Sequence, residues 1–258
     1  MIGYCPLASG SKGNCTYFGT ENTKLLIDAG LSARATEAKL AEIGVEMEDI
    51  DAILITHEHT DHILGLKVLA LKKGIPVLSN QETAKGIVSQ LRACPKLKIF
   101  STGEPFEFGD LEIHPFSIHH DTLDPVAFTI QTPKHKIGIC TDIGFATSVV
   151  EHQLKGCDYL ILEANHEPAM VHASPRPMVY KQRVLSRHGH LSNEACGQLL
   201  SRIAHADLKH VHLAHLSQEC NSPDKALSIV SETLSRYGIS LPLSIAHQER
   251  ISHAISFN

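Results

Sequence analysis

The chain has 258 residues, of which 43% are hydrophobic and 20% are charged, and this is enough apolar material to bury a sizeable core. Its formal net charge of −5 excludes a general attraction to nucleic acid, so such a partner would need a local basic patch or bound metal ions. The 18 histidines, set against 0 tryptophans and 5% aromatic residues, point to metal or proton chemistry.

Membrane-spanning and secreted proteins do not fit the pattern. A membrane helix needs about 20 consecutive apolar residues, and the most apolar region, residues 63–78, is interrupted by Lys67, Lys72 and Lys73. The first residues lack the basic start and apolar stretch of a secretory signal. The 7 cysteines include no C-x-x-C pair, which favours reduced thiols over disulfides or a cysteine-type zinc finger. We therefore expect a cytoplasmic protein with no membrane partner.

The N-terminal part of the chain predicts a hairpin followed by a helix. Residues 16–19 and 23–28 are β-prone runs joined by a short turn, which is typical of two antiparallel strands. Ser32 is the expected N-cap of a helix over residues 33–43, and Gly44 is expected to end it.

The rest of the chain continues this mixture of strands and helices. Apolar runs of strand length predict strands at residues 51–56, 76–78, 98–100, 106–108, 111–118, 126–131, 136–141, 159–163 and 209–214. Helices are expected at residues 63–73, 81–91, 147–154, 192–206 and 223–237. Residues 166–189 contain three prolines and no clear periodicity, which predicts a long loop. Two strand-rich halves with helices outside predict an α/β sandwich, formed by a single domain over residues 1–258.

A dense group of metal-ligand residues follows the expected strand at residues 51–56. Residues 57–62 read His-Glu-His-Thr-Asp-His. Residues two apart in an extended segment share a face, so His57 and His59 can point into one site, and the next turn presents Asp61 and His62. Such groups are costly to bury unpaired, and active sites of α/β proteins gather at strand ends. The pattern therefore favours a metal site over a solvated polar loop.

Further donors stand at the C-terminal ends of other apolar runs. They are His119-His120-Asp121 after residues 111–118, Asp142 after residues 136–141, and His215 after residues 209–214. Neighbouring strand residues face opposite ways, so at most one of His119 and His120 is expected to be a ligand. The repeated placement predicts that these strand ends contribute to a metal centre.

These motifs resemble a known superfamily. The H-x-H-x-D-H pattern at residues 57–62, the upstream strand Leu-Leu-Ile-Asp-Ala-Gly at residues 25–30, and the later Asp142 and His215 are similar to the metallo-β-lactamase fold superfamily. A narrower resemblance, to the YycJ/WalJ-type exonuclease group, is carried by four further strings. They are LASGSKGN at residues 7–14, LEANH at 162–166, HGHLSNE at 188–194 and AHLS at 214–217.

The resemblance implies a four-layer αββα sandwich with two divalent metal ions. By position, His57, His59 and His120 would hold the first ion, Asp61, His62 and His215 the second, and Asp142 would bridge them. The family pattern places a ligand immediately before an aspartate, which selects His120 over His119. Asp28 would orient the loop of residues 57–62 by hydrogen bonds, with a turn cap as the alternative interpretation.

The chemistry expected of such a centre is hydrolysis. Two cations roughly 3.5–4 Å apart lower the pKa of a bridging water, supply hydroxide and clamp the oxygens of an in-line displacement. Histidine and aspartate donors suit zinc and also accept manganese. His190 is the first candidate for the acid that protonates the leaving group and His166 the second, while a structural role at the start of a helix competes for His190.

The substrate is less strongly indicated. Between His166 and His190 the chain carries Arg176, Lys181, Arg183 and Arg187 against the single acid Glu167. This stretch is either a local patch for nucleic acid or an ordinary solvated surface. The resemblance implies a 5′-to-3′ exonuclease that cleaves phosphodiester bonds of DNA. The alternatives are a hydrolase of a small cyclic phosphodiester or thioester, and a non-hydrolytic metal sensor.

Overall fold

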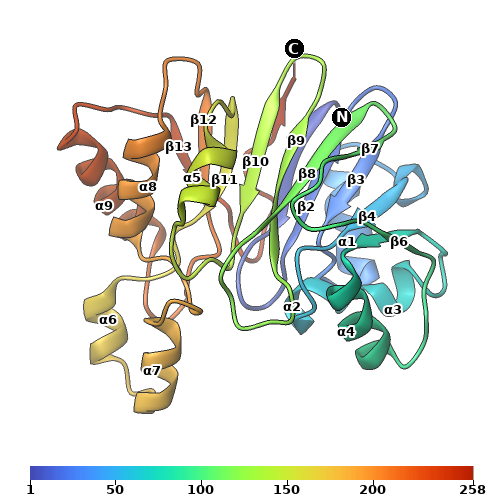
Figure 1. Ribbon diagram of the computed structural model, residues 1–258, viewed down its shortest axis with the longest axis horizontal. Helices are drawn as coiled ribbons and strands as arrows, with labels where there is room; N and C mark the ends of the chain where they lie inside the picture. Colours follow the sequence, from blue (N-terminus) through green and yellow to red (C-terminus); the bar gives the residue numbers. More distant parts are fainter. Residues whose placement is uncertain (258) are drawn as a thin grey trace. The chain divides into compact units, whose positions relative to one another are not determined.

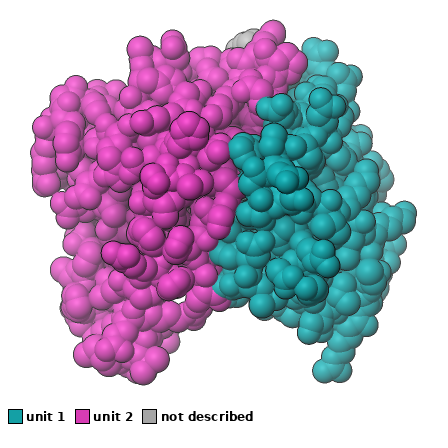
Figure 2. All heavy atoms as spheres, in the orientation of Figure 1, with its two compact units in different colours: residues 1–115, 122–126, 246–258 teal, residues 116–121, 127–245 magenta. Residues whose placement is uncertain are grey.

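The computed structural model describes residues 1–257. By compactness the chain divides into two units, coloured separately in Figure 2. Unit 1 comprises Met1–Pro115, Thr122–Val126 and the chain from Ala246 onward, and unit 2 comprises Phe116–Asp121 and Ala127–Ile245. The expectation of a single domain over residues 1–258 stays a prediction.

Unit 1 contains a mixed sheet with the strand order β14-β1-β2-β3-β4-β5-β6 (Figure 1). Its strands are β1 (Gly3–Ala8), β2 (Cys15–Gly19), β3 (Lys24–Ile27), β4 (Ala52–Leu54), β5 (Val77–Ser79), β6 (Leu97–Ile99) and β14 (Ile255–Ser256). Strands β14 to β3 pair antiparallel, which confirms the β2–β3 hairpin, whereas β3 to β6 pair parallel. Sequence reasoning did not find β1 or β14.

The helices of unit 1 confirm the predictions at residues 33–43 and 81–91 and correct a third. They are α1 (Ala33–Glu42), the 3-10 turn η1 (Met47–Asp49), α2 (Thr60–Ile63), α3 (Leu66–Leu69) and α4 (Gln81–Leu91). Ser32 caps α1 as expected, because its side chain accepts the Ala35 N–H. The single helix expected over residues 63–73 is wrong. The chain breaks at Gly65, whose N–H donates to the carbonyl of Ala29 at 2.7 Å instead of continuing one helix.

The second sheet has the strand order β13-β12-β11-β10-β9-β8-β7. Its strands are β7 (Phe106–Phe108), β8 (Leu111–Ser117), β9 (Val126–Gln131), β10 (Lys136–Cys140), β11 (Tyr159–Glu163), β12 (His210–Ala214) and β13 (Leu243–Ile245). Strands β10 to β13 pair parallel, and β9 pairs antiparallel with β10. Two mixed sheets with helices confirm the predicted α/β class.

The helices of unit 2 are α5 (Ser148–Leu154), α6 (Pro168–Ala173), α7 (Met178–Val184), α8 (Asn193–Ile203) and α9 (Pro223–Ser235). The long loop expected over residues 166–189 is wrong, because this stretch forms α6 and α7. Its prolines begin helices instead of breaking them, since Pro168 is the first residue of α6 and Pro177 is the N-cap of α7. A small buried cluster of Val171, Val184 and Cys220 holds the two short helices.

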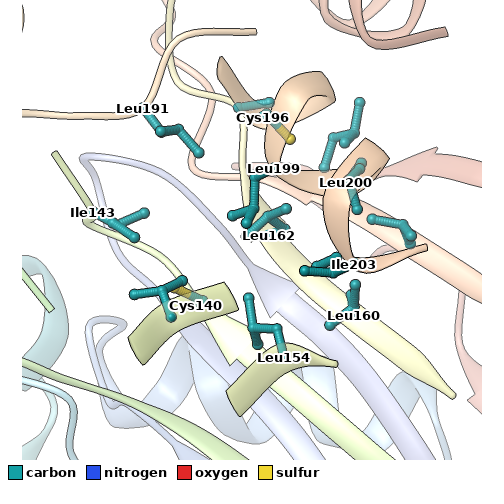
Figure 3. Close-up of a cluster of buried hydrophobic side chains, with 14 of the residues drawn as sticks. Cys140, Ile143, Leu154, Leu160, Leu162, Leu191, Cys196, Leu199, Leu200 and Ile203 are labelled. Atoms are coloured by element: carbon teal, nitrogen blue, oxygen red, sulfur yellow. The ribbon is translucent and has the colours of Figure 1, made fainter. Parts of the chain in front are cut away.

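The core of unit 2 lies between strands β9 to β13 and helices α5, α8 and α9. Figure 3 shows Leu160 and Leu162 of β11 among the side chains of α8, including Leu199 and Leu200. Cys140 lies in this core, as expected, and burial raises the pKa of its thiol well above the usual value. Within residues 1–257 no disulfide links the cysteines, and all of them except the exposed Cys94 are buried.

The parallel strands determine where polar side chains gather. In unit 1 the chain leaves β4 into residues 55–62, and in unit 2 it leaves β10, β11 and β12 at Asp142, Ala164 and His215. Polar groups at these ends are held by a rigid sheet. None of the helices within residues 1–257 has the length and apolar character that crossing a membrane requires.

Candidate metal centre

Unit 1 presents the first donor group at the end of β4. His57 and His62 are fully buried, and the Nε2 atom of His57 lies 3.2 Å from the Nδ1 atom of His59. The short helix α2 then carries Asp61, whose Oδ2 atom lies 3.6 Å from Nε2 of His62. The four predicted donors of this segment are therefore arranged along one turn of backbone that leaves a buried strand.

Asp28 fixes this turn from behind. Its buried carboxylate accepts hydrogen bonds from the backbone N–H of Thr56 at 2.9 Å, from the Thr56 hydroxyl at 3.0 Å, and from Nδ1 of His62 at 2.8 Å. A carboxylate only accepts, so the proton of neutral His62 sits on Nδ1 and Nε2 carries the lone pair. Asp28 thus makes the contacts expected of a group that orients a metal ligand.

Asn14, directly before β2, contacts two of the same donors. Its Nδ2 atom lies 3.0 Å from Nε2 of His62 and 3.2 Å from Oδ2 of Asp61. The backbone N–H of Asn14 also donates to the carbonyl of Asp61 at 2.8 Å. In the sequence, Asn14 stood out only as the last residue of the string at residues 7–14. The contact depends on chain segments 47 residues apart, which no local pattern reveals.

Unit 2 builds its donor group around Glu163, a fully buried carboxylate at the end of β11. Its Oε1 atom accepts from Nδ1 of His190 at 2.9 Å and from Nδ1 of His215 at 2.8 Å. Its Oε2 atom accepts the backbone N–H groups of Ile143 and Leu191, both at 2.9 Å. Four donors therefore converge on one carboxylate, which fixes both imidazole rings through their Nδ1 atoms.

The charge of Glu163 is stabilised by the same contacts. Burial alone would raise the pKa of this carboxyl, but the charge of His190 and the hydrogen bonds from His190 and His215 outweigh burial and lower the pKa to about 2. Sequence reasoning did not identify Glu163 as a site residue. The available signal was a lone acid at the end of an otherwise apolar strand, since a buried charge requires partners.

Asp142 and His215 lie together beside Glu163. Oδ1 of Asp142 is 3.2 Å from Nδ1 of His215 and 3.7 Å from Nε2 of His120. Asp142 and His215 both adopt left-handed backbone conformations, with φ of 56° and 55°, and Asp28 in unit 1 does the same with φ of 60°. Such conformations are rare outside glycine and concentrate at functional sites.

The structure separates His120 from its neighbour His119. His120 is buried, its Nδ1 atom donates to the carbonyl of Gly189 at 3.1 Å, and its Nε2 atom is directed toward Asp142. Burial lowers the pKa of His120, which favours the neutral ring that metal ions bind. His119 is exposed, and its ring lies against Phe145. The alternation argument that at most one of the pair faces the donor group agrees with this arrangement.

The two candidates for a leaving-group acid have different surroundings. His190 is one-fifth exposed and hydrogen-bonded to Glu163. His166 is 2% exposed, its Nδ1 atom has no hydrogen-bond partner within residues 1–257, and burial lowers its pKa to about 4. His190 is therefore the better candidate, because it is open to solvent and a carboxylate partner stabilises its protonated ring, whereas His166 is buried with no such partner on Nδ1.

The depressed pKa of His166 predicts acid sensitivity. The unfolded chain takes up a proton near pH 6.5, whereas the folded chain does so near pH 4. Above pH 6.5 His166 is neutral in both states, and its protonation costs no stability. As the pH falls toward 4, only the unfolded chain gains this proton, so the free energy of unfolding falls by about 3 kcal/mol. Urea unfolding of the wild type and His166→Asn across this range should show a shallower pH dependence in the variant. Parallel curves would contradict the prediction.

The donor chemistry of unit 2 fits a divalent metal ion. Ligand atoms of Asp142, Glu163, His190 and His215 all lie within 4.8 Å of one another. Imidazole and carboxylate donors suit zinc and manganese. Glu163 serves better as the acceptor behind two histidines than as a ligand, because its two oxygens already accept four hydrogen bonds.

Comparison with known proteins agrees with this chemistry. Residues 23–213 match the model of the β-lactamase superfamily domain. The chain is 37% identical to Exodeoxyribonuclease YycJ of Bacillus anthracis over 90% of this chain and 89% of that protein. It is also 37% identical to Exodeoxyribonuclease WalJ of Streptococcus pneumoniae, over 86% of this chain and 84% of that protein.

Solved structures show the same fold at low sequence identity. Zn(2+)-bound PqqB from Methylobacterium extorquens aligns over 99% of this chain and 100% of its own, with a TM-score of 0.75 and 14% identity. The metallo-β-lactamase fold protein YhfI from Bacillus subtilis aligns over 96% of this chain and 97% of its own, with a TM-score of 0.72 and 16% identity. The chain therefore belongs to the β-lactamase superfamily, has the metallo-β-lactamase fold, and is a metal-dependent hydrolase of the group that includes YycJ and WalJ.

Proposed function

We propose that this hydrolase is a deoxyribonuclease that removes nucleotides from the 5′ end of a DNA strand. The observation that carries the proposal is the 37% identity, over most of both chains, to proteins named exodeoxyribonucleases. The buried cluster around Glu163 supports it, because it places candidate metal ligands beside a histidine that can donate a proton, a combination suited to metal-assisted phosphodiester hydrolysis.

We propose that the chain binds two zinc ions and that manganese can replace them. The assignment follows the family motif: His57, His59 and His120 for one ion, Asp61, His62 and His215 for the other, and Asp142 between them. It is supported within unit 1 by the single turn that carries four of these donors, and within unit 2 by the 3.2 Å contact between Asp142 and His215.

Bound metal ions would supply activation of water and neutralisation of the negative charge that develops on the phosphate. The chain's own contribution is the pair of Glu163 and His190. The ionised carboxylate holds Nδ1 of His190 at 2.9 Å and stabilises the doubly protonated ring. Nε2 of that ring then donates a proton to the oxygen that leaves phosphorus. Asp28 keeps His62 in the tautomer whose Nε2 is a ligand.

The proposal is tested with the metal-reconstituted full chain on 5′-labelled and 3′-labelled DNA, single-stranded and double-stranded. We expect release of nucleotides from the 5′ end, abolished by EDTA and restored by zinc or manganese. Asp142→Ala should remove both cleavage and bound metal, as measured by inductively coupled plasma mass spectrometry. The exposed Asp207→Ala serves as the matched control and should retain both.

Other outcomes would identify another function. Hydrolysis of bis(p-nitrophenyl) phosphate or a cyclic nucleotide without cleavage of DNA would replace the proposal with a small-substrate hydrolase. Release from the 3′ end would reverse the assigned polarity. Tight zinc binding without hydrolysis of any of these substrates would indicate a metal sensor.

A further inference from the structure

An exposed group of rings and one cation lies beside the donor cluster of unit 2. The rings of His119 and Phe145 pack edge to face with centroids 4.7 Å apart, and the ring of His188 lies 5.9 Å from that of His119. The guanidinium of Arg187 lies 5.1 Å from the centroid of Phe145. His119, Arg187 and His188 are exposed and Phe145 is half-exposed, so the group faces solvent.

The backbone holds this group, which we call the ring platform, on the same turns as the metal-site residues. The N–H of Gly144 donates to the carbonyl of His119 at 2.9 Å. A Cβ atom on Gly144 would lie 2.1 Å from the carbonyl oxygen of Arg187, so the turns after β10 and after α7 touch without space for a side chain. His119 immediately precedes His120, and His188 stands two residues before His190. The ring platform is therefore positioned by the turns that position the chemistry.

Arg187 differs from the other basic side chains between α6 and His190. Arg176 pairs with Glu219, and Arg183 pairs with Asp121 at 2.5 Å. Lys181 donates to the carbonyl of His172 at 2.6 Å. Within residues 1–257 the guanidinium of Arg187 contacts a ring and pairs with no carboxylate. It is the cation of this stretch that is available to an external anion.

We propose that the ring platform is a binding site for the DNA strand, and this rests on the proposed function. A nucleobase packs against the solvent-facing side of the rings of Phe145, His119 and His188, and Arg187 binds a phosphate of the same strand. Every base has a π-face, so stacking on exposed rings holds a strand without regard to its sequence. A guanidinium that is already held over a ring matches the geometry of a phosphate. This would place the scissile phosphodiester bond at the neighbouring ends of the β-strands, where the candidate metal ligands lie.

Binding is measured by fluorescence anisotropy on the full metal-loaded chain, with a short single-stranded DNA whose phosphorothioate links resist cleavage. A strand of the same length with abasic residues retains the charge but lacks the bases. Phe145→Leu keeps the apolar bulk and loses the ring. We expect it to weaken binding of the base-bearing strand by about tenfold and of the abasic strand by less than about twofold.

Arg187→Gln should lower the binding affinity for both the base-bearing and the abasic strand by about tenfold. It should also reduce the slope of log affinity against log salt concentration by about 1. Arg176→Gln is the matched control, since Arg176 also lies over a ring, that of Tyr180 at 5.4 Å, but is paired with Glu219. It should change neither affinity by more than about twofold. Metal content should be the same in all these variants.

The results separate the two proposals. If the wild type cleaves DNA but Phe145→Leu binds both strands as the wild type does, the ring platform is not a base-binding site and the nuclease proposal stands. If the wild type prefers the base-bearing strand and Phe145→Leu loses that preference, yet no DNA is cleaved under any metal loading, the nuclease proposal fails and the binding site stands. Loss of metal from Phe145→Leu would overturn the binding interpretation.

Discussion

Replacing Glu163 with glutamine is expected to lower the rate of metal-dependent hydrolysis by about 10- to 100-fold. The carboxylate accepts four hydrogen bonds, two from the rings of His190 and His215 and two from the backbone N–H groups of Ile143 and Leu191. A glutamine amide has one oxygen and one NH₂ group, so one pair of donors must face another donor. Each donor that stays buried without a partner costs about 1–3 kcal/mol.

The variant should therefore lose both stability and activity, by separable routes. We expect the free energy of unfolding to fall by about 3 kcal/mol, metal affinity to fall because the tautomer of the proposed ligand His215 is no longer fixed, and hydrolysis to fall further because His190 loses its carboxylate partner. Thermal unfolding, metal titration and hydrolysis of bis(p-nitrophenyl) phosphate measure the three quantities. Glu167→Gln, which changes a partly exposed acid four residues along the chain, is the control. Wild-type metal affinity in Glu163→Gln would show that Glu163 does not orient the ligands.

The candidate donors can be picked out from the sequence because their signal is local. His57, Asp142 and His215 each follow an apolar run of strand length, and polar residues at such positions stand out in a single sequence. The hydrogen bonds of Glu163 join segments 20 to 52 residues apart, and those of Asp28 join segments 28 and 34 residues apart. A pattern in one segment does not specify the partner in another, so Glu163 was missed and the role of Asp28 came from resemblance.

The helices also divide into those that local sequence determines and those that tertiary contacts determine. Helices with a local cap and a continuous apolar face, such as α1 and α4, were predicted within a residue or two at each end. Helices α6 and α7 have six and seven residues, too short to be stable alone, and form because Val171 and Val184 pack against Cys220. The break at Gly65 has a similar origin, since it depends on the carbonyl of Ala29. Tertiary contacts decide these elements, and the sequence alone does not display them.

Gly30→Ala is expected to destabilise the protein by about 3 kcal/mol or more and to reduce hydrolysis by about 100-fold. A Cβ atom on Gly30 would lie 1.7 Å from the carbonyl oxygen of Asp61 and 2.5 Å from the backbone nitrogen of Asn14. The contact involves backbone on both sides, so no side-chain rotation relieves it. The strand end that carries Asp28 must then separate from the turn that carries Asp61 and His62, and the hydrogen bond from Ala29 N–H to the His62 carbonyl, 2.7 Å long, is strained with it.

Gly156→Ala distinguishes crowding from backbone strain. Gly156 has φ of 74°, a left-handed conformation, and no heavy atom within residues 1–257 lies within 4 Å of the place that a Cβ atom would take. Its replacement by alanine therefore carries a conformational cost of about 1–2 kcal/mol but causes no collision. Chemical denaturation should therefore give a much lower free energy of unfolding for Gly30→Ala than for Gly156→Ala. The rate of hydrolysis should fall only in Gly30→Ala. Equal losses of stability in the two variants, with activity intact in both, would mean that the turn of residues 57–62 moves without cost and that close packing at Gly30 does not hold the ligands in place.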